Sequence, residues 1–545
     1  MSLGKNATAR HALARVGIAA IVAIAASTAV SVGAGQNPVA AAPAATAAYV
    51  AVQPCRLADT RDGVGYTLID STTIQISSRN VCGIPAGATS LALTLTVVSP
   101  QATGFLTAWP AAQARPTVSN LNFNGDQVRA NGSIIRLDSS GAFRVFTNVA
   151  AHIVVDVVGA FVPASTAKAG RFVSRPPARV LDTRSGAPLG PTSQVNVAVP
   201  AGVPADAVAL ALNITVTESA GPGFVTQYPT GRTMPTSSVL NVDRPDQTRA
   251  AAGIFPVSSA GATLYLSGGG HVVVDVVGYF TGPSAANSGD GLFTAYDPAR
   301  LMDTRGASPI GNGVPLYPGG GLELATNRGG SMAYNITSVE GNSGFVTAYP
   351  AGTDRPGTSS VNPVGGGDVV ANFAITQMSN RGLAVFAQNQ THVLVDVQGW
   401  FSGPTATATV GPLSNTAPPV PQPSYSACIT EGLPAINAKR SVRLVRNAAA
   451  EAWACSWALQ LAIAGGLSHS DAAPRDAAVG CGTGENIAYS TGTSIPNLYS
   501  MWYASRPHLA NIQNGVYRGA GTGFVIRTDP NGGQRIFGVN VFAVC

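Results

Sequence analysis

The chain has 545 residues, too many for one hydrophobic core, so several domains are expected. Only 11% of the residues are charged, whereas Gly and Pro contribute 62 and 38 residues, a composition typical of short strands joined by turns. The net charge is +6, but Lys and Arg are scattered and form no basic run interleaved with aromatic residues. This pattern argues against a nucleic acid partner.

The N-terminus has the three parts of a secretory signal. Several basic residues precede an uncharged apolar run at about residues 16–32, and small residues follow. We therefore predict a signal peptide at 1–34 and a mature chain that is secreted, extracellular or held at the cell surface. Cleavage after Ala34 and cleavage near Ala41 or Ala42 both fit the sequence. An uncleaved segment that anchors the chain is the alternative, because about 17 apolar residues are just long enough to span a bilayer.

Six cysteines are present, and none lies in a C-x-x-C pair. In an oxidising compartment we expect three disulfides rather than a zinc ribbon or a thioredoxin-like motif. Cys55 is expected to pair with Cys82, because both lie in one module and the other cysteines are far downstream. The last four allow three connectivities, and we favour the one that joins the first and last residues of the C-terminal domain. Its two bonds are Cys455–Cys481 and Cys428–Cys545.

An internal repeat of about 120 residues organises most of the chain. Each of three copies begins with Arg-x-x-Asp-Thr-Arg and ends with His-x-(Val/Leu)-Val-Asp-Val-x-Gly-x-Phe. A period of this length corresponds to a whole domain, so we predict three tandem domains. Their boundaries are 48–163, 170–283 and 291–404.

Each copy is predicted to be an all-β sandwich or barrel. Runs such as 90–98, 208–216 and 271–280 are rich in Val, Leu, Ile and Thr, and Gly, Pro, Asn and Asp separate them. The closing motifs resemble the Val-Val-Asp-Val-x-Gly-Tyr-Phe modules that accompany secreted actinobacterial enzymes. That resemblance implies an exported accessory module, with a surface or adhesion role, and no established activity.

The polar residues within the repeats are interpreted as structural. The His and Asp of each closing strand are about 13 Å apart along the strand, too far to share one metal ion. We expect the three aspartates to be buried against Arg or backbone amides, because an unpaired buried carboxylate is strongly disfavoured. These residues are Asp156, Asp275 and Asp396. Asn213 and Asn335 match the glycosylation sequon, but both lie within apolar strand patterns and are interpreted as chance matches.

Residues 405–427 are predicted to be a Pro-rich, semi-extended linker, since residues 405–426 carry no charge and contain five prolines. The remaining residues, 428–545, suffice for one small α+β domain. Its clearest helix is predicted at 448–464, with Asn447 as N-cap and a glycine pair as the stop. Strand-like segments follow at 521–527 and 534–541.

This domain contains four motifs in a fixed order along the chain. They are Ser468-His469, then Gly484-Glu485-Asn486-Ile487-Ala488, then Trp502 with His508-Leu509-Ala510-Asn511-Ile512, and finally an aromatic closing strand. Together they resemble the CAP superfamily, the secreted group that includes the cysteine-rich secretory proteins and the SCP-like proteins of bacteria. The resemblance covers about a fifth of the chain. It implies an α-β-α sandwich, so the predicted fold class is multidomain, with three tandem all-β repeats followed by an α+β CAP domain.

The resemblance also implies a cleft where His469, Glu485 and His508 meet. Ser505 stands near the place where family members often have a second glutamate. Two His and one carboxylate can hold zinc with an open position, so a weakly bound zinc or other divalent ion is one interpretation. A bare cleft scaffold and a catalytic site are the other two. No catalytic residue is assigned, and no cofactor is required.

Two functions follow from these alternatives. We favour a secreted or cell-surface bacterial protein that is not an enzyme. Its CAP cleft would bind an apolar or envelope-derived ligand, such as a lipid, while the β repeats act as surface modules. The alternative is a metal-assisted extracellular peptidase or hydrolase that uses His469, Glu485 and His508. No Gly-x-Ser-x-Gly or His-Glu-x-x-His motif occurs, which argues against the enzyme.

Overall fold

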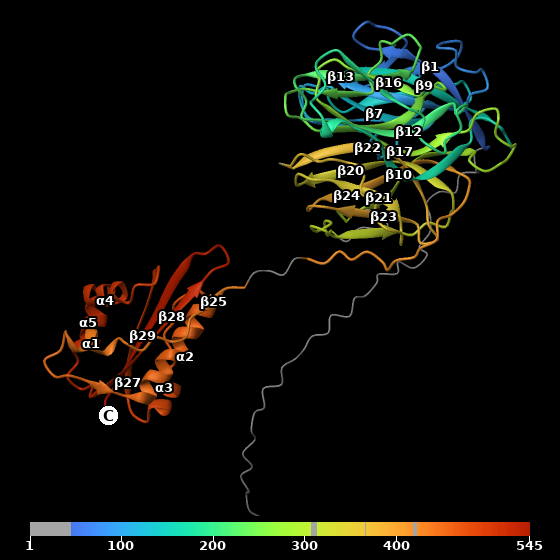
Figure 1. Ribbon diagram of the computed structural model, residues 1–545. Coiled ribbons are helices and arrows are strands. Elements are labelled where there is room, and N and C mark those ends of the chain that lie inside the picture. Colours follow the sequence, from blue (N-terminus) through green and yellow to red (C-terminus); the bar gives the residue numbers. More distant parts are fainter. Residues whose placement is uncertain (1–44, 307–312, 366, 418–421) are drawn as a thin grey trace, which may run out of the picture. The chain divides into compact units, whose positions relative to one another are not determined.

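The computed structural model describes residues 45–306, 313–365, 367–417 and 422–545 (Figure 1). The predicted signal peptide lies outside these residues. The chain divides into two compact units, one ending at Ala417 and the other starting at Pro418. Among the described residues, no helix is long and apolar enough to cross a membrane.

Each repeat in the first unit is a pair of β-sheets around its own apolar core. The first repeat contains β1 (Ala47–Asp59), β2 (Thr67–Asp70), β3 (Thr73–Ser77), β4 (Ser90–Val98), β5 (Gly104–Pro110), β6 (Leu121–Phe123), β7 (Arg129–Arg136), β8 (Ala142–Thr147) and β9 (His152–Pro163). The second contains β10 (Phe172–Asp182), β11 (Ser193–Val197), β12 (Ala209–Thr217), β13 (Gly223–Pro229), β14 (Leu240–Val242), β15 (Arg249–Pro256), β16 (Ala262–Leu266) and β17 (His271–Phe280). The third contains β18 (Phe293–Asp303), β19 (Gly321–Leu324), β20 (Ser331–Gly341), β21 (Val346–Pro350), β22 (Asp368–Gln377), β23 (Leu383–Ala387) and β24 (His392–Phe401).

The closing strand of each repeat pairs with the first strand, and an ion pair joins the two. The Nε–H groups of Arg56, Arg179 and Arg300 donate to the closing-strand aspartates at 2.6, 2.9 and 2.8 Å. Those aspartates, Asp156, Asp275 and Asp396, are at most 2% exposed. The prediction that they are buried against arginine or backbone amides is therefore confirmed, and arginine is the partner.

The three repeats share a second core where their sheets meet. From each repeat it contains one aromatic residue of the first strand and one of the closing strand, all at most 5% exposed. They are Tyr49, Phe161, Phe172, Phe280, Phe293 and Phe401. The three closing phenylalanines contact one another, with ring centroids 5.7–6.5 Å apart. Because equivalent residues from all three repeats meet, the repeats pack around a common line with approximate threefold symmetry.

Buried asparagines join the repeats beside this core. The Asn131 side chain donates to Asn335 Oδ1 at 2.9 Å, and Asn372 donates to Asn213 Oδ1 at 3.0 Å. Both contacts cross from one repeat to another. Asn213 and Asn335 are 6% and 1% exposed, so a glycan has no room at either residue. Their burial supports the interpretation of the sequons as chance matches.

The second unit is built on one five-stranded sheet with short helices around it. Its elements are β25 (Ser424–Tyr425), α1 (Leu433–Asn437), β26 (Val445–Arg446), α2 (Ala448–Ala464), α3 (Ala472–Val479), β27 (Thr483–Thr491), α4 (Ile495–Ala504), α5 (Arg506–Gln513), β28 (Gly519–Thr528) and β29 (Gln534–Ala543). The prediction for α2 is confirmed, including its cap, because the Asn447 side chain accepts from the Ala450 N–H at 2.9 Å. Gly521 and Gly523 let α2 lie close to the sheet, since a Cβ there would meet the α2 backbone.

The predicted fold class is wrong. The repeats are not three separate tandem domains, because β1 pairs with β18 and merges strands of the first and third repeats into one eight-stranded sheet. The described residues are mostly β, with 47% in strands and 10% in helices, and no α+β domain of the CAP type is evident at the C-terminus. Of the helices in the described residues, only α2 exceeds ten residues, because Pro, Gly and Asn interrupt the remaining helical segments.

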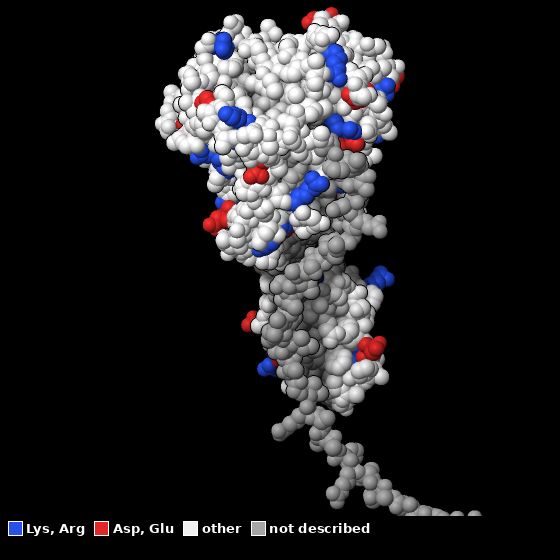
Figure 2. Space-filling view, turned by 90° about the vertical axis from the view of Figure 1, so that its right-hand side faces the viewer, with Lys and Arg blue, Asp and Glu red and all other residues white. Residues whose placement is uncertain are grey.

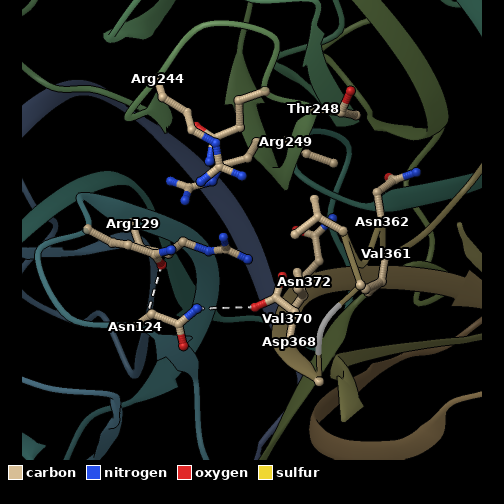
Figure 3. A pocket seen from close by; sticks show the side chains of 16 residues that line it. Asn124, Arg129, Arg244, Thr248, Arg249, Val361, Asn362, Asp368, Val370 and Asn372 are labelled. Carbon is tan, nitrogen blue, oxygen red and sulfur yellow. Dashed lines mark hydrogen bonds between the residues drawn. The ribbon is translucent and has the colours of Figure 1, made fainter. Parts of the chain in front are cut away.

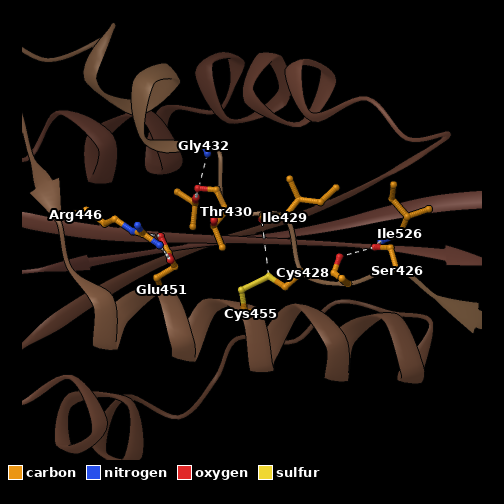
Figure 4. The surroundings of a disulfide bond; sticks show 11 residues. Ser426, Cys428, Ile429, Thr430, Gly432, Arg446, Glu451, Cys455 and Ile526 are labelled. Carbon is orange, nitrogen blue, oxygen red and sulfur yellow. Dashed lines mark hydrogen bonds and ion pairs between the residues drawn. A yellow bond between two sulfur atoms is a disulfide. The ribbon is translucent and has the colours of Figure 1, made fainter.

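Three disulfides are present, one with the predicted pairing. The Cα atoms of Cys55 and Cys82 are 5.7 Å apart. The other two predicted pairings are wrong, because strand order places the partners differently. Cys428 follows β25 and lies against α2, which contains Cys455; both β25 and α2 adjoin β28 (Figure 4). Cys481 precedes β27, and the start of β27 pairs with the end of β29, which Cys545 follows. The bonds are therefore Cys428–Cys455 and Cys481–Cys545, in place of Cys455–Cys481 and Cys428–Cys545.

Much of the predicted linker at 405–427 is attached to the two units. The Leu413 N–H donates to Glu323 Oε1 at 3.2 Å, and the Asn415 side chain donates to the Pro315 carbonyl at 2.9 Å. At the other end, β25 pairs with β28. Proline lacks a backbone donor, so these contacts use the other residues of the segment.

The shared aromatic core predicts a large effect of one truncation. Phe401→Ala removes a fully buried ring from the meeting point of all three repeats and is expected to lower the free energy of unfolding of the first unit by about 3–5 kcal/mol. Phe224→Ala, at a side chain 41% exposed, is the matched control and should cost less than about 1 kcal/mol. Urea unfolding of both variants measures the difference. Equal losses would contradict a common core.

Candidate functional site

The C-terminal unit brings His469 and Glu485 into direct contact. His469 lies in the loop between α2 and α3, and Glu485 lies on β27 opposite Val541. The His469 Nδ1 and Glu485 Oε2 atoms are 2.8 Å apart. The glutamate side chain is 2% exposed, whereas the histidine side chain is 58% exposed. The pair therefore has a buried carboxylate and a ring open to solvent.

Both oxygens of Glu485 are occupied by further donors. The Ser470 N–H donates to Oε2 at 3.0 Å, and the Ser470 hydroxyl donates to Oε1 at 2.6 Å. The buried Arg475 guanidinium is 3.5 Å from Oε1 and also donates to the Ser470 carbonyl. The Trp453 indole N–H is 3.2 Å from the Ser470 hydroxyl oxygen. Glu485 is thus the centre of a compensated buried network that joins the loop before α3 to β27.

His508 lies on α5, near the pair but bound differently. Its backbone carbonyl accepts from the Asn486 side chain at 2.9 Å. Its Nδ1 atom is buried and has no hydrogen-bond partner among the described residues. Burial, followed by repulsion from the nearby His469, lowers the pKa of His508 below its ordinary value. The ring is therefore kept neutral beside its more exposed neighbour.

Ser505 occupies a helix junction. It ends α4 and precedes α5; its N–H donates to the Met501 carbonyl, and its own carbonyl accepts from the Leu509 N–H. In the described part of the chain, no hydrogen bond of its hydroxyl is recorded to His469, Glu485 or His508. Its contacts are those of a residue that turns the backbone between two helices.

These residues do not fit a metal site. Across 45–306, 313–365, 367–417 and 422–545, no group of three or more His, Cys, Asp or Glu is arranged to hold a metal ion. Glu485 already accepts from Ser470 and faces Arg475, whose positive charge opposes a cation. Ser470 and Arg475 were missed from the sequence. The one signal for them was Arg475 itself, a cation in a short helix whose other residues, apart from Asp476, are small and apolar.

A second candidate site is an apolar groove of about 460 Å³ between the second and third repeats. Its apolar lining includes Val277 and Ala374, together with several prolines. Arg175 and Arg355 also line it. On the face drawn in Figure 2, charged residues of both signs are scattered among neutral ones. The groove could not be predicted from the sequence, because it forms only where two repeats meet.

The network around Glu485 predicts a strong dependence of stability on this residue. Glu485→Ala leaves Arg475 buried without its carboxylate and is expected to destabilise the C-terminal unit by about 3–5 kcal/mol. Glu431→Ala changes an exposed carboxylate of the same unit and should change stability by less than about 0.5 kcal/mol. Thermal unfolding compares the two variants. A stable Glu485→Ala protein would show that the network is not structural.

His508 predicts a specific pH dependence. Its pKa is lower in the folded unit than the value of about 6.5 expected when unfolded, so the unfolded chain binds more protons below that pH. The contribution is fully present above about pH 6.5 and is lost as the pH falls through the folded pKa. The melting temperature of the C-terminal unit should therefore fall between pH 7 and pH 5. His508→Gln should flatten this part of the profile, and an unchanged slope would contradict the assignment.

No protein-family model matches the chain, and no curated protein matches it. The function is therefore inferred from the residues of this chain.

Proposed function

We propose that the chain is an exported, non-catalytic protein that binds an apolar component of the cell envelope, with the groove between the second and third repeats as the binding site. Three disulfides support an oxidising, extracellular environment for both units. The signal-like N-terminus supports export as well.

The apolar groove is the observation that carries this proposal. Its volume of about 460 Å³ lies within the range of small-molecule sites, and apolar side chains line most of such sites. Val277 is the closing-strand residue that faces it, two positions after the buried Asp275. The equivalent residue of the third repeat is Gln398, whose Oε1 accepts from the Ile134 N–H at 2.8 Å and so bonds to the neighbouring repeat. In the second repeat this position is Val277, whose apolar side chain lines the groove.

The chemistry of the groove favours a lipid chain. Val277, Ala374 and the prolines of the lining provide an apolar wall, and burying a hydrocarbon there gains about 25 cal/mol for each Å² removed from water. Arg175 and Arg355 line the groove and offer guanidinium groups to an anionic head group. Of the two carboxylates that also line it, Asp275 is already paired with Arg179, and Asp354 makes no ion pair with any described residue. The sequence-based expectation assigned the ligand to the C-terminal domain; we assign it to the repeats, because the apolar surface lies there.

The C-terminal unit supports a non-catalytic role. Glu485 is bound by Ser470 and Arg475, so its oxygens are not free to accept a proton from a reacting water. His469 and Glu485 are instead suited to hold the loop before α3 against β27. The peptidase alternative needs an available carboxylate, and nothing in this geometry favours it.

A binding measurement tests the proposal. A fluorescent C16 fatty acid titrated into the full chain is expected to bind with micromolar affinity, and Val277→Glu should weaken binding at least tenfold, because a carboxylate enters the groove. Val64→Glu makes the same change at a side chain 50% exposed in the first repeat and should bind as the parent does.

Two outcomes would contradict the proposal. One is fatty-acid binding that Val277→Glu leaves unchanged. The other is cleavage of a broad peptide library by the parent that is lost in Glu485→Gln, which would support the peptidase instead.

A further inference from the structure

A polar cavity of about 230 Å³ lies where the three repeats meet, and each repeat contributes to its wall. The first repeat contributes Asn124 and Arg129, the second Arg249, and the third Asp368 and Asn372. Figure 3 shows the Arg129 side chain reaching into the space beside Asp368, with Arg249 across from it. Cations from two repeats therefore face one enclosed volume.

Strand register shows why two arginines meet here. Gly132, Ala252 and Phe373 occupy equivalent positions, opposite Thr94, Asn213 and Asn335 on the neighbouring strand of their own repeats. Three residues earlier, the first two repeats have Arg129 and Arg249, and the third has Val370. Because the three repeats are arranged with approximate symmetry, the guanidinium groups of Arg129 and Arg249 both lie near the line where the repeats meet. The third repeat has Val370 at the equivalent position and so contributes no cation.

The two arginines differ in how their charge is compensated. Arg249 is 2.6 Å from Asp243 and donates to the carbonyls of Val128 and Asn241. Arg129 is 9% exposed, yet its side chain has no ion pair or hydrogen bond to any described residue. The Asp368 carboxylate accepts from Asn124 at 3.5 Å and makes no ion pair with either arginine among the described contacts. A buried guanidinium without a partner is strongly disfavoured, so a bound anion is the natural partner for the Arg129 side chain.

Arg129 remains charged despite this burial. Burial lowers its pKa to about 10 and repulsion from Arg249 adds to the effect, whereas attraction to Asp368 and Asp243 opposes it. A group with this pKa is still protonated at neutral pH. With Arg244 also on the wall, the cations near the cavity outnumber the carboxylates of Asp243 and Asp368.

We propose that this cavity binds a small oxyanion of the phosphate class, with Arg129 and Arg249 as the groups that contact it. The planar fork of a guanidinium matches phosphate oxygens and binds them in pairs. The volume of about 230 Å³ exceeds that of one water, roughly 30 Å³, so the cavity holds a small anion with a few waters. The anion supplies the charge that Arg129 lacks, and it joins all three repeats at their meeting point. This site is independent of the groove proposed above for an apolar ligand.

The site is tested by calorimetric titration of the full chain with inorganic phosphate, at an ionic strength kept constant with sodium chloride. The expected result is one site per chain with an affinity in the micromolar to millimolar range. Arg129→Gln should weaken phosphate binding at least tenfold. Arg232→Gln is the matched control, because Arg232 is an exposed arginine of the same unit; its affinity should stay within twofold of the parent.

The melting temperature separates a ligand role from a structural one. Phosphate should raise it in the parent by several degrees relative to chloride and should not raise it in Arg129→Gln. In chloride, Arg129→Gln should melt at or above the parent temperature, because the variant removes an uncompensated buried charge. Should Arg129→Gln fail to fold, Arg129→Lys retains the charge without the fork and is expected to lose affinity several-fold.

Titration with glycerol 3-phosphate distinguishes free phosphate from a phosphate that is the head group of a larger molecule. Binding of this compound as tightly as phosphate indicates the head group of a larger molecule, and binding of phosphate alone indicates the free ion. The proposal is overturned if phosphate produces neither heat nor a melting shift in the parent, or if Arg129→Gln binds phosphate as the parent does.

Discussion

Six aromatic rings packed at the meeting point of the repeats determine the architecture of the first unit. Each repeat contributes one ring from its first strand and the phenylalanine that ends its closing strand, and the ring centroids of neighbouring pairs lie 4.5–6.5 Å apart. These side chains project away from the core of their own repeat. A single repeat would expose them, so burial requires all three copies. The groove and the polar cavity both result from this packing, since each is enclosed by residues of more than one repeat.

Local features of the fold were readable from the sequence. The period of the repeats, the strands near 90–98 and 271–280, and the helix at 448–464 with its cap all follow from short-range patterns, and the structure has each of them. The burial of Asp156 against a partner was anticipated for a similar reason, because a buried carboxylate requires one; that the partner is Arg56 comes from the structure.

Contacts between repeats were not readable in the same way. Phe161 and Phe401 resemble ordinary core residues of a closing strand, and nothing in one copy shows that they face another copy. The same holds for Asn131 and Asn335, whose hydrogen bond spans 204 residues.

The wrong prediction of two disulfide pairings has a related cause. Pairing among Cys428, Cys455, Cys481 and Cys545 is decided by strand order, and strand order depends on contacts that no local pattern encodes.

The buried asparagines have a consequence for producing the protein. Asn213-Ile214-Thr215 and Asn335-Ile336-Thr337 are hidden once the repeats have packed, but both are exposed in the newly translocated chain. A eukaryotic secretory pathway attaches its oligosaccharide to such sequons before folding is complete. A sugar on Asn335 would take the place of the Asn131 contact and hold the first and third repeats apart. Expression hosts that lack N-glycosylation are therefore suited to this chain, and yeast or mammalian secretion would select against its native assembly.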